Sequence, residues 1–230
     1  MNIGVFTTIK IKNGIPLFFD RHRERLLAQA AKLNLEKVSI RLANVQHYLK
    51  KNNLLDCALK ITITKEDNKT SITYKTRPLP QTLISCKAIT IQDTRNYLKI
   101  YKTTNRILHD RAKKIAMEHG ADDAIFTFNE KIVESTICNI FSVNKQGEII
   151  TPPMRTKGLN GITRQLIIEQ TNVIEIDINQ NTKGPLVLVN SLRIQKVTHL
   201  NGKKLLDGEK LMQKIKKIIE KNEEAYLQKL

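Results

Sequence analysis

The chain has 230 residues, 40% of them apolar and 27% charged, so it can form one large domain or two small ones and is neither a disordered tail nor a membrane span. Its 39 lysines and arginines against 22 acidic residues give a net charge of +17, which favours anionic partners. Aromatic residues are only 5% and tryptophan is absent, however, so base-stacking platforms are scarce and no nucleic-acid partner is expected.

The cysteines and the first residues indicate the compartment. Cys57, Cys86 and Cys138 are odd in number and far apart, which argues against a disulfide framework and against a zinc site. The first residues lack the basic start and the long apolar stretch of a secretory signal. We therefore expect a cytoplasmic protein with no metal and no membrane partner.

The N-terminal part predicts strands and helices in alternation. Residues 3–12 and 15–19 form a hairpin around the Asn13-Gly14 turn, and Asp20 is expected to cap a helix with apolar residues at helical spacing. A second helix at 40–50 and strands at 58–64, 70–75 and 86–91 follow. The next residues are polar and poorly periodic, which predicts a small N-terminal α/β domain at 1–92 and a linker at 93–103.

The remaining residues, 104–230, predict a larger C-terminal domain. A helix at 104–119 ends at Gly120, and a second helix starts at Gly161. The expected strands lie at 124–128, 131–134, 138–143, 148–150, 174–178 and 186–189. The chain closes with a basic amphipathic helix whose apolar stripe packs into the core.

Most familiar catalytic motifs are absent from the sequence. It has no G-x-S-x-G, no phosphate-binding G-x-x-x-x-G-K-[ST], no H-E-x-x-H and no C-x-x-C, and its histidines lack metal-ligand spacing. Five short segments remain, at 101–106, 121–125, 133–141, 150–152 and 159–164. In this order and spacing they resemble the class IV pyridoxal-phosphate enzymes, which include branched-chain and D-amino-acid aminotransferases and aminodeoxychorismate lyase.

This resemblance covers nearly the whole chain, from Gly4 to about Asp207. It implies an α/β protein of the α+β type, with the two-domain class IV fold: a small N-terminal α/β domain and a larger C-terminal cofactor-binding domain built as a pseudo-barrel. It also implies pyridoxal 5'-phosphate as the cofactor, a small-molecule substrate and a homodimer.

The resemblance assigns roles near the reacting atoms to three residues. Lys102 matches the lysine that forms a Schiff base with the cofactor, a task that suits a primary amine on a flexible stem. Glu134 matches the carboxylate that keeps the pyridine nitrogen protonated. Arg106 stands where branched-chain transaminases usually have a tyrosine near the phenolic oxygen of the cofactor.

The phosphate of the cofactor needs donors and positive charge. The helix that starts at Gly161 offers the N–H groups of Ile162 and Thr163 together with the Thr163 hydroxyl, and Ser191 matches a further hydroxyl donor. Arg25 matches the family arginine that clamps the phosphate. The nearby residues Arg21 and Arg23 are its competitors.

The choice within the family favours aminodeoxychorismate lyase, a step of folate biosynthesis. Thr7 stands where transaminases typically have a glutamate, and Lys60 stands where they carry a substrate-facing arginine. Thr8 and Lys60 are expected beside the substrate. In the expected reaction Lys102 moves protons while the ring aromatises, which releases p-aminobenzoate and pyruvate.

Three other interpretations stay open at this point. The first is an aminotransferase for branched-chain or D-amino acids on the same fold. The second is a basic nucleic-acid-binding protein without enzymatic activity, and the third is an inactive paralogue of the family.

Overall fold

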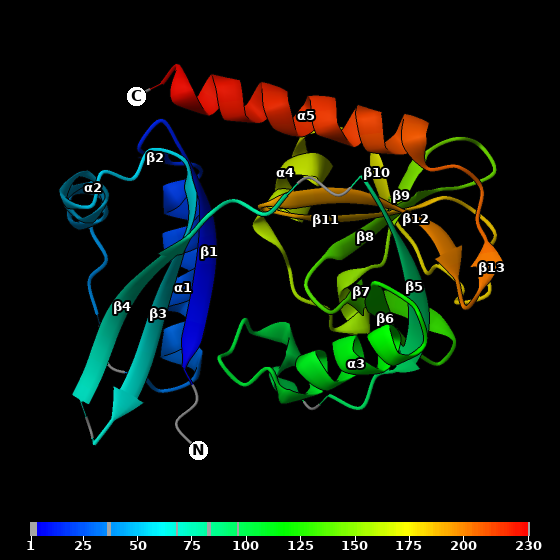
Figure 1. The fold of residues 1–230 in the computed structure, drawn as a ribbon, viewed down its shortest axis with the longest axis horizontal. Coiled ribbons are helices and arrows are strands. Elements are labelled where there is room, and N and C mark those ends of the chain that lie inside the picture. The colour runs from blue at the N-terminus through cyan, green and yellow to red at the C-terminus, as the bar shows by residue number, and fades with distance from the viewer. Residues whose placement is uncertain (1–3, 36–37, 68, 82–83, 96, 230) are drawn as a thin grey trace. The chain divides into compact units, whose positions relative to one another are not determined.

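The computed structural model describes residues 4–35, 38–67, 69–81, 84–95 and 97–229, which form two compact units (Figure 1). The first unit contains the described residues up to 81 together with 101–105 and those from 222 onward, and the second contains the rest. The units do not follow the expected boundaries. The strand at Ser85–Gln92 pairs inside the second unit, whereas 101–105 and the chain end join the first.

The first unit is a four-stranded antiparallel sheet with helices α1 (Phe19–Lys32) and α2 (Leu42–Lys51). Its strands, in the order β2-β1-β3-β4, are β1 (Val5–Lys12), β2 (Ile15–Pro16), β3 (Cys57–Glu66) and β4 (Lys69–Arg77). The expected hairpin is confirmed, with Asn13 and Gly14 at φ of 52° and 75°. Asn68, in the connection between the strands expected at 58–64 and 70–75, lies outside the described residues.

Alternation along β1 separates two faces of this sheet. Val5, Ile9 and Ile11 pack into a core with Phe19 and Leu26 of α1. Thr7 shares this face, whereas Phe6, Thr8, Lys10 and Lys12 lie on the other, because successive side chains of a strand point to opposite sides. The sheet therefore buries one face under the helices and leaves the other for polar groups.

Helix α1 begins differently from the prediction. Asp20 was expected as the N-cap, but Phe18 holds that position in a left-handed conformation, with φ of 53°, and Asp20 lies in the first turn. The N–H of Phe19 donates to the hydroxyl of Tyr226, 3.2 Å away. A tertiary contact therefore replaces the local cap, and sequence spacing alone does not reveal it.

The second unit is a curled nine-stranded sheet, in the order β10-β9-β8-β11-β12-β5-β6-β7 with β13 paired to β12. These strands are β5 (Ser85–Gln92), β6 (Asp123–Phe128), β7 (Lys131–Ser135), β8 (Asn139–Val143), β9 (Ile149–Thr151), β10 (Val173–Glu175), β11 (Leu186–Asn190), β12 (Arg193–Leu200) and β13 (Lys203–Lys204). Its helices are η1 (Tyr97–Ile100), α3 (Ile107–Glu118), η2 (Met154–Thr156), α4 (Ile162–Gln170) and α5 (Glu209–Leu227), the last of which ends in the first unit.

Both faces of this sheet are buried along β11. Leu186 and Leu188 face the core inside the curl, and Val187 and Val189 face a core shared with α4 and α5. Such burial on two faces explains the continuous apolar run of this strand. The α/β class, with a small N-terminal unit and a larger C-terminal unit on a curled sheet, agrees with the expectation.

Two elements of the second unit differ from the prediction. Helix α3 begins at Ile107 rather than at residue 104, because the preceding residues are held in extended conformation. Strand β12 was not predicted, because its many polar side chains hide the alternation of apolar and polar residues that is typical of a strand. Its pairing with β5 and β11 makes it a strand. Gly120, expected to end α3, has φ of 68°.

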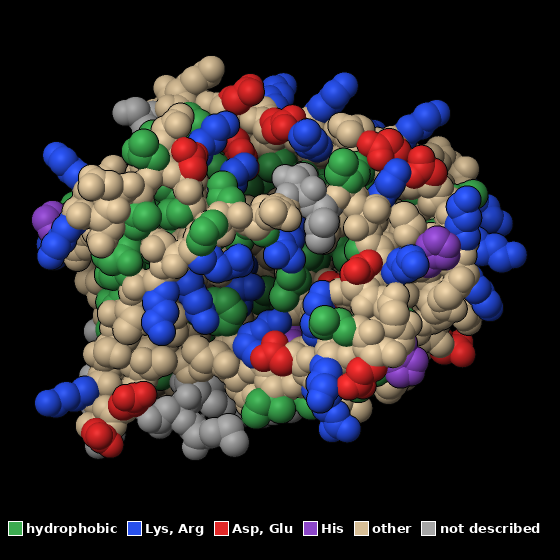
Figure 2. Space-filling view, in the orientation of Figure 1, with side chains coloured by type: hydrophobic (Ala, Val, Ile, Leu, Met, Phe, Trp, Pro, Cys, Tyr) green, Lys and Arg blue, Asp and Glu red, His purple; other side chains and the backbone are tan. Residues whose placement is uncertain are grey.

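The charge of the chain is spread over both units. Figure 2 shows lysine and arginine side chains over the elements of each, with aspartates and glutamates among them. In the described part of the chain, no helix combines the length and the apolar character needed to cross a membrane.

Candidate functional site

Lys102 lies in a short extended segment that adds to the edge of β1. The N–H of Phe6 donates to the carbonyl of Lys102 at 2.9 Å, and the N–H of Thr104 donates to the carbonyl of Gly4 at 2.8 Å. From the helix side, the N–H of Lys102 donates to Oε1 of Gln29 at 3.1 Å. Because both backbone groups of Lys102 are hydrogen-bonded, the start of its flexible side chain has a defined position.

The side chain of Lys102 shares an aromatic ring with a second lysine. Its Nζ lies 4.9 Å from the centroid of the Phe6 ring, and Nζ of Lys60 lies 4.3 Å from the same centroid. Thr8 is paired with Lys60 in the β1–β3 register. This face of the first unit therefore carries two ammonium groups beside one ring, an arrangement that attracts anions.

Arg25 is the arginine of α1 that is best placed to bind an anion. It lies three residues after His22, on the same helix face, and its Nη2 donates to the Thr7 hydroxyl at 3.1 Å. Burial lowers the pKa of Arg25 to about 10, and a nearby anion would stabilise its charge. Its competitor Arg23 instead contacts the exposed Asp20 at 3.4 Å.

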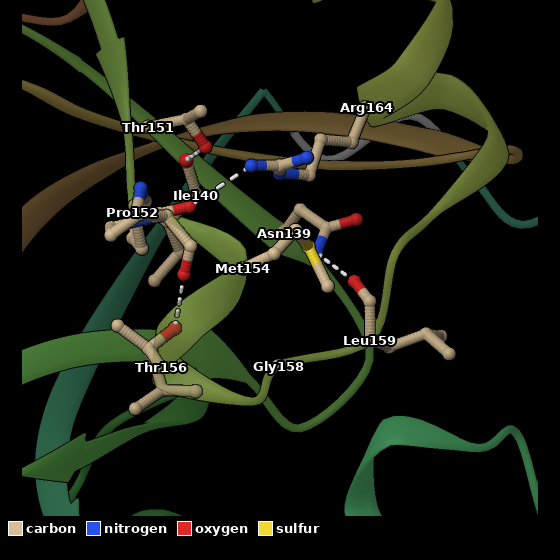
Figure 3. A pocket seen from close by; sticks show the side chains of 11 residues that line it. Asn139, Ile140, Thr151, Pro152, Met154, Thr156, Gly158, Leu159 and Arg164 are labelled. Carbon is tan, nitrogen blue, oxygen red and sulfur yellow. Dashed lines mark hydrogen bonds between the residues drawn. The ribbon is translucent and has the colours of Figure 1, made fainter. Parts of the chain in front are cut away.

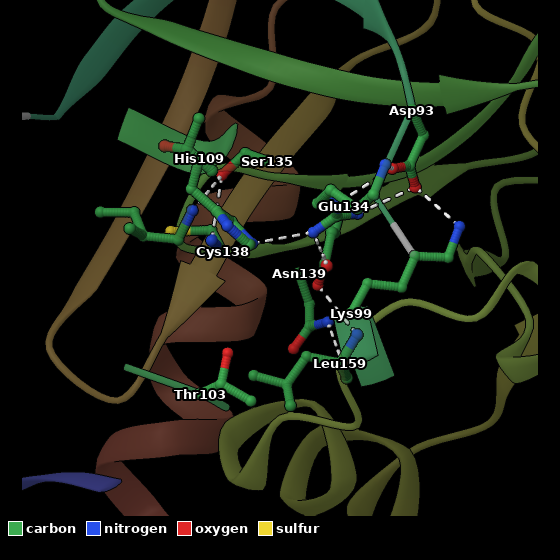
Figure 4. A network of polar contacts seen from close by, with 12 residues as sticks. Asp93, Lys99, Thr103, His109, Glu134, Ser135, Cys138, Asn139 and Leu159 are labelled. Carbon is green, nitrogen blue, oxygen red and sulfur yellow. Dashed lines mark hydrogen bonds and ion pairs between the residues drawn. The ribbon is translucent and has the colours of Figure 1, made fainter. Parts of the chain in front are cut away.

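Glu134, on β7, is buried and held from two sides (Figure 4). Its Oε1 accepts from Nη1 of Arg95 at 2.7 Å, and its Oε2 accepts from the N–H of Leu159 at 3.0 Å. A carboxylate offers about four acceptor sites, so these two bonds leave room for another donor. A protonated pyridine nitrogen is a donor of that kind.

Arg95 also contacts groups that the sequence reasoning missed. It binds both carboxylate oxygens of Asp93 at 2.9–3.0 Å, and its Nη1 lies 3.0 Å from Nε2 of His109. Lys99 donates to Asp93 at 2.9 Å. Although burial opposes it, the cations of Arg95 and Lys99 hold the pKa of Asp93 below its usual value.

Asp93, Arg95 and Lys99 lie in the polar segment 93–103, which was expected to be a linker. A signal was present, because Asp93 and Arg95 directly follow the carboxyl end of β5, which is parallel to β6 and β12. Ligands bind at the carboxyl ends of parallel strands in open α/β sheets. Polar residues just after a strand that pairs in parallel were therefore a cue for a site.

The start of α4 suits a phosphate group. Gly161 is the N-cap, and no described side chain caps the helix, so its first N–H groups are available to an anion. Thr163 is buried, and its Oγ1 lies 3.4 Å from Oγ of Ser191. Ile162 buries its side chain in the core, so it can offer only its backbone N–H.

A loop connects this helix start to Glu134. Gly161 needs to be a glycine, because a Cβ there would collide with Oδ1 of Asn139. The Asn139 amide donates to the carbonyl of Leu159 at 2.8 Å, and the Leu159 N–H binds Glu134. One short segment thus supports both the carboxylate and the helix start.

A small pocket opens under the same loop (Figure 3). Gly158 and Leu159 line one part of it, and Arg164 of α4 lines another. Arg164 donates to the carbonyl of Pro152 at 3.1 Å and pairs with Glu175. These bonds tie the beginning of the loop to the helix that follows it.

Arg106 lies directly before α3 and donates from Nη2 to the carbonyl of Thr136 at 2.8 Å. Burial lowers the pKa of Arg106, because its charge loses hydration. The charges of Glu134 and Asp123 are close enough to act on it in the opposite direction.

The structure thus forms two groups from the predicted site residues, one in each unit. Thr8, Arg25, Lys60 and Lys102 lie in the first unit, and Arg106, Glu134, Ile162, Thr163 and Ser191 lie in the second. In the second unit, helix N–H groups and hydroxyls fit a phosphate, and a held carboxylate fits a ring N–H. In the first unit, the half-buried Arg25 offers a cation to an anion, so the residues of each unit fit parts of pyridoxal phosphate.

Comparisons with known proteins identify a matching family and a relative. The model of the family "Amino-transferase class IV" matches residues 4–195. A D-alanine aminotransferase of Bacillus licheniformis is 27% identical over 215 residues, which cover 85% of this chain and 75% of that protein.

Two solved structures show the shared fold. A Legionella pneumophila protein, provisionally named 4-amino-4-deoxychorismate lyase, is similar with a TM-score of 0.86 and 23% identity, over 96% of this chain and 91% of that one. The pyridoxal-phosphate-bound form of a hypothetical aminotransferase from Mycobacterium tuberculosis is similar with a TM-score of 0.80 and 18% identity, over 94% and 88%.

Proposed function

Because this chain belongs to the class IV aminotransferase family, whose enzymes depend on pyridoxal phosphate, we propose that it is a lyase that converts 4-amino-4-deoxychorismate into p-aminobenzoate and pyruvate. This reaction would serve folate biosynthesis in the cytoplasm. The resemblance in the opening residues 4–8 and the cationic face of the first unit support this choice within the family.

In the proposed site, different residues bind different parts of the cofactor. Lys102 would bind its aldehyde carbon, and the Glu134 carboxylate would stabilise the charge of its ring nitrogen. Arg106 would act on its phenolic oxygen. Arg25 of the first unit, and Ser191, Thr163 and the N–H of Ile162 of the second, are the groups that would hold its phosphate.

When bound, pyridoxal phosphate supplies an electron sink for negative charge that develops on the substrate. Lys102 acts as the general base that takes a proton from the substrate carbon and then as the acid that returns it. Arg95 orients Glu134, because its guanidinium contacts the carboxylate directly. The aromatic ring forms as the three-carbon side chain leaves as pyruvate.

The observation that carries the lyase assignment is the Lys60 cation on the polar face of the first unit. The substrate has one carboxylate on its ring and one on its three-carbon side chain, and this face places Nζ of Lys60 4.3 Å from the centroid of the Phe6 ring, with Thr8 paired to Lys60. This ammonium group, which Lys102 leaves to the substrate by binding the cofactor, suits a dianion better than a small amino acid with one carboxylate.

The second candidate is a D-amino-acid aminotransferase. The 27% identity to the D-alanine aminotransferase of Bacillus licheniformis favours it. In that enzyme class Lys102 and Glu134 would have the same roles toward the cofactor, and only the fate of the substrate would differ. An aminotransferase for branched-chain amino acids is a related alternative.

Two kinds of assay separate these candidates, one for the lyase reaction and one for amino-group transfer. Purified protein with pyridoxal phosphate is given 4-amino-4-deoxychorismate, and p-aminobenzoate and pyruvate are measured together. In parallel it is given D-alanine with 2-oxoglutarate, and then a branched-chain amino acid. We expect equal amounts of p-aminobenzoate and pyruvate, and transfer of an amino group without p-aminobenzoate would contradict the lyase.

Two variants test the proposed roles of Lys102 and Lys60. Lys102→Ala should abolish activity, and borohydride reduction followed by peptide mapping should label position 102 in the wild type only. Lys60→Met should raise KM for aminodeoxychorismate about tenfold, because one charged hydrogen bond is lost. Lys32→Met, which changes an exposed lysine at the end of α1, is the matched control.

The family resemblance also leads us to propose a homodimer. Sedimentation equilibrium of the protein saturated with pyridoxal phosphate should give twice the mass of the chain. A monomer that retains full activity would contradict this proposal.

A further inference from the structure

A buried hydroxyl joins a histidine to the arginine proposed to bind phosphate. Thr7 Oγ1 lies 2.6 Å from Nδ1 of His22 and 3.1 Å from Nη2 of Arg25. Thr7 is 0% exposed and His22 is 1% exposed, so water does not compete for these bonds. The contact links β1 to α1 through side chains 15 and 18 residues apart.

The direction of the two hydrogen bonds follows from the chemistry of the groups. A guanidinium has donors only, so Arg25 donates to the Thr7 oxygen. In the His22 tautomer with its proton on Nε2, Nδ1 accepts the hydroxyl hydrogen of Thr7, and we assign this tautomer here. Burial, and then the charges of Arg25 and Lys102, lower the pKa of His22 well below 6.5, which keeps this imidazole neutral.

From this geometry we infer that Thr7 and His22 are positioning residues that hold the Arg25 guanidinium ready for the phosphate of the cofactor. Arginine has several rotatable bonds, and fixing them costs entropy that a prearranged hydrogen bond offsets before the ligand arrives. Thr7 accepts from Arg25 and donates to His22, so each bond orients the other. The inference rests on the proposed role of Arg25 in phosphate binding.

The inference explains two features of the first unit. Threonine is neutral, so it can orient Arg25 and leave the whole positive charge of the guanidinium to an anion. His22 and Arg25 are three residues apart, which places both on the helix face toward β1. Arg23 lacks this relation to His22 and contacts Asp20 instead.

The test compares two ligands and four substitutions at Thr7 and His22. Equilibrium titrations of the apoprotein measure the affinity for pyridoxal phosphate and for pyridoxal, which lacks the phosphate. Thr7→Val, which keeps the shape but removes the hydroxyl, should weaken pyridoxal phosphate binding about tenfold and leave pyridoxal binding unchanged. Thr7→Ser should restore the affinity, because it keeps the hydroxyl. His22→Asn, which keeps an acceptor near the position of Nδ1, should bind more tightly than His22→Leu.

Arg25→Met separates the inference from the proposal on which it rests. If Arg25→Met leaves the affinity for pyridoxal phosphate unchanged, Arg25 does not bind the phosphate and the earlier assignment fails. If Arg25→Met weakens binding but Thr7→Val does not, the positioning role alone is overturned. Equal weakening of both ligands by Thr7→Val, without rescue by serine, would also overturn it. In the double variant Thr7→Val with Arg25→Met, the two effects should not add.

Discussion

At the residue scale, Arg95 connects two buried carboxylates that would otherwise repel each other. It binds Glu134 at 2.7 Å and Asp93 at 2.9 Å, and its own side chain is only 3% exposed. Although burial opposes it, the hydrogen bond that Asp93 accepts and the charge of Glu134 raise the pKa of Arg95. A single guanidinium thus binds both carboxylates.

Replacing Arg95 should therefore be costly. Arg95→Met leaves two buried carboxylates without this cation, and we expect a loss of about 3–5 kcal/mol in the free energy of unfolding in urea. Arg95→Lys should lose less, since an ammonium can still neutralise one carboxylate. Arg23→Met, at a partly exposed surface pair, should change stability by no more than about 0.5 kcal/mol. Equal effects of Arg95→Met and Arg23→Met would contradict this account.

His22 gives the stability of the first unit a pH dependence. Its pKa is lowered in the folded state by burial and by the cations of Arg25 and Lys102, so below about pH 6.5 the unfolded chain binds a proton that the folded chain does not. Stability should then fall with decreasing pH, by up to about 1.4 kcal/mol per pH unit from this group. Above about pH 7 the contribution should be constant.

Urea unfolding of the wild type and of His22→Asn, between about pH 7 and pH 5, measures this slope. Asparagine does not titrate, so the wild type should lose stability more steeply than the variant as the pH falls. Parallel pH profiles would show that His22 is not the group responsible.

At the element scale, the loop before α4 links the Glu134 carboxylate to the expected phosphate site. Asn139 holds the carbonyl of Leu159, and the space beside Gly161 is filled by the same amide. Gly161→Ala should push Asn139 away, weaken the binding of pyridoxal phosphate and cost about 1–3 kcal/mol of stability. Cofactor titration and urea unfolding measure the two effects.

Removing the Asn139 side chain supplies the control for this prediction. In the double variant Gly161→Ala with Asn139→Ala, the added methyl group has space, so the loss should be smaller than the sum of the two single losses. Additive losses would mean that the collision with Asn139 is not the cause.

At the scale of the whole molecule, the end of the chain completes the unit with which the chain begins. Glu223 pairs with Lys10 at 2.8 Å, and the hydroxyl of Tyr226 accepts the first N–H of α1. The ring of Tyr226 also packs on Phe18, with centroids 5.1 Å apart. Helix α1, which carries Arg25, therefore depends on residues about two hundred positions later.

Tyr226→Phe tests this dependence. It keeps the ring contact but removes the acceptor for the N–H of Phe19, and we expect a loss of about 1 kcal/mol in stability. Tyr48→Phe, in a ring pair with Tyr74 on the same unit, is the matched control and should have a smaller effect. If the two variants are equally stable, the hydroxyl of Tyr226 does not cap α1.

Several elements and motifs could be predicted from the sequence because their signals are local. Asn13-Gly14 predicts its hairpin through the left-handed conformations that these residues tolerate, and the apolar run of β11 predicts a strand buried on both faces. The motifs around Lys102, Glu134 and Gly161 led to the family, and a match to its model over residues 4–195 confirmed it. The role of each site residue stays a prediction.

Other features were decided only by the tertiary structure, because their causes lie far apart in the chain. The polar segment with Asp93 and Arg95 has no local period, and its partner Glu134 comes 39 residues after Arg95. The cap of α1 comes from Tyr226, 207 residues after Phe19, and Lys102 joins β1 nearly one hundred residues after that strand begins. Spacing along a sequence reports on helices, strands and turns, whereas a buried charge or an open hydrogen-bond donor is satisfied by whatever group the fold places beside it.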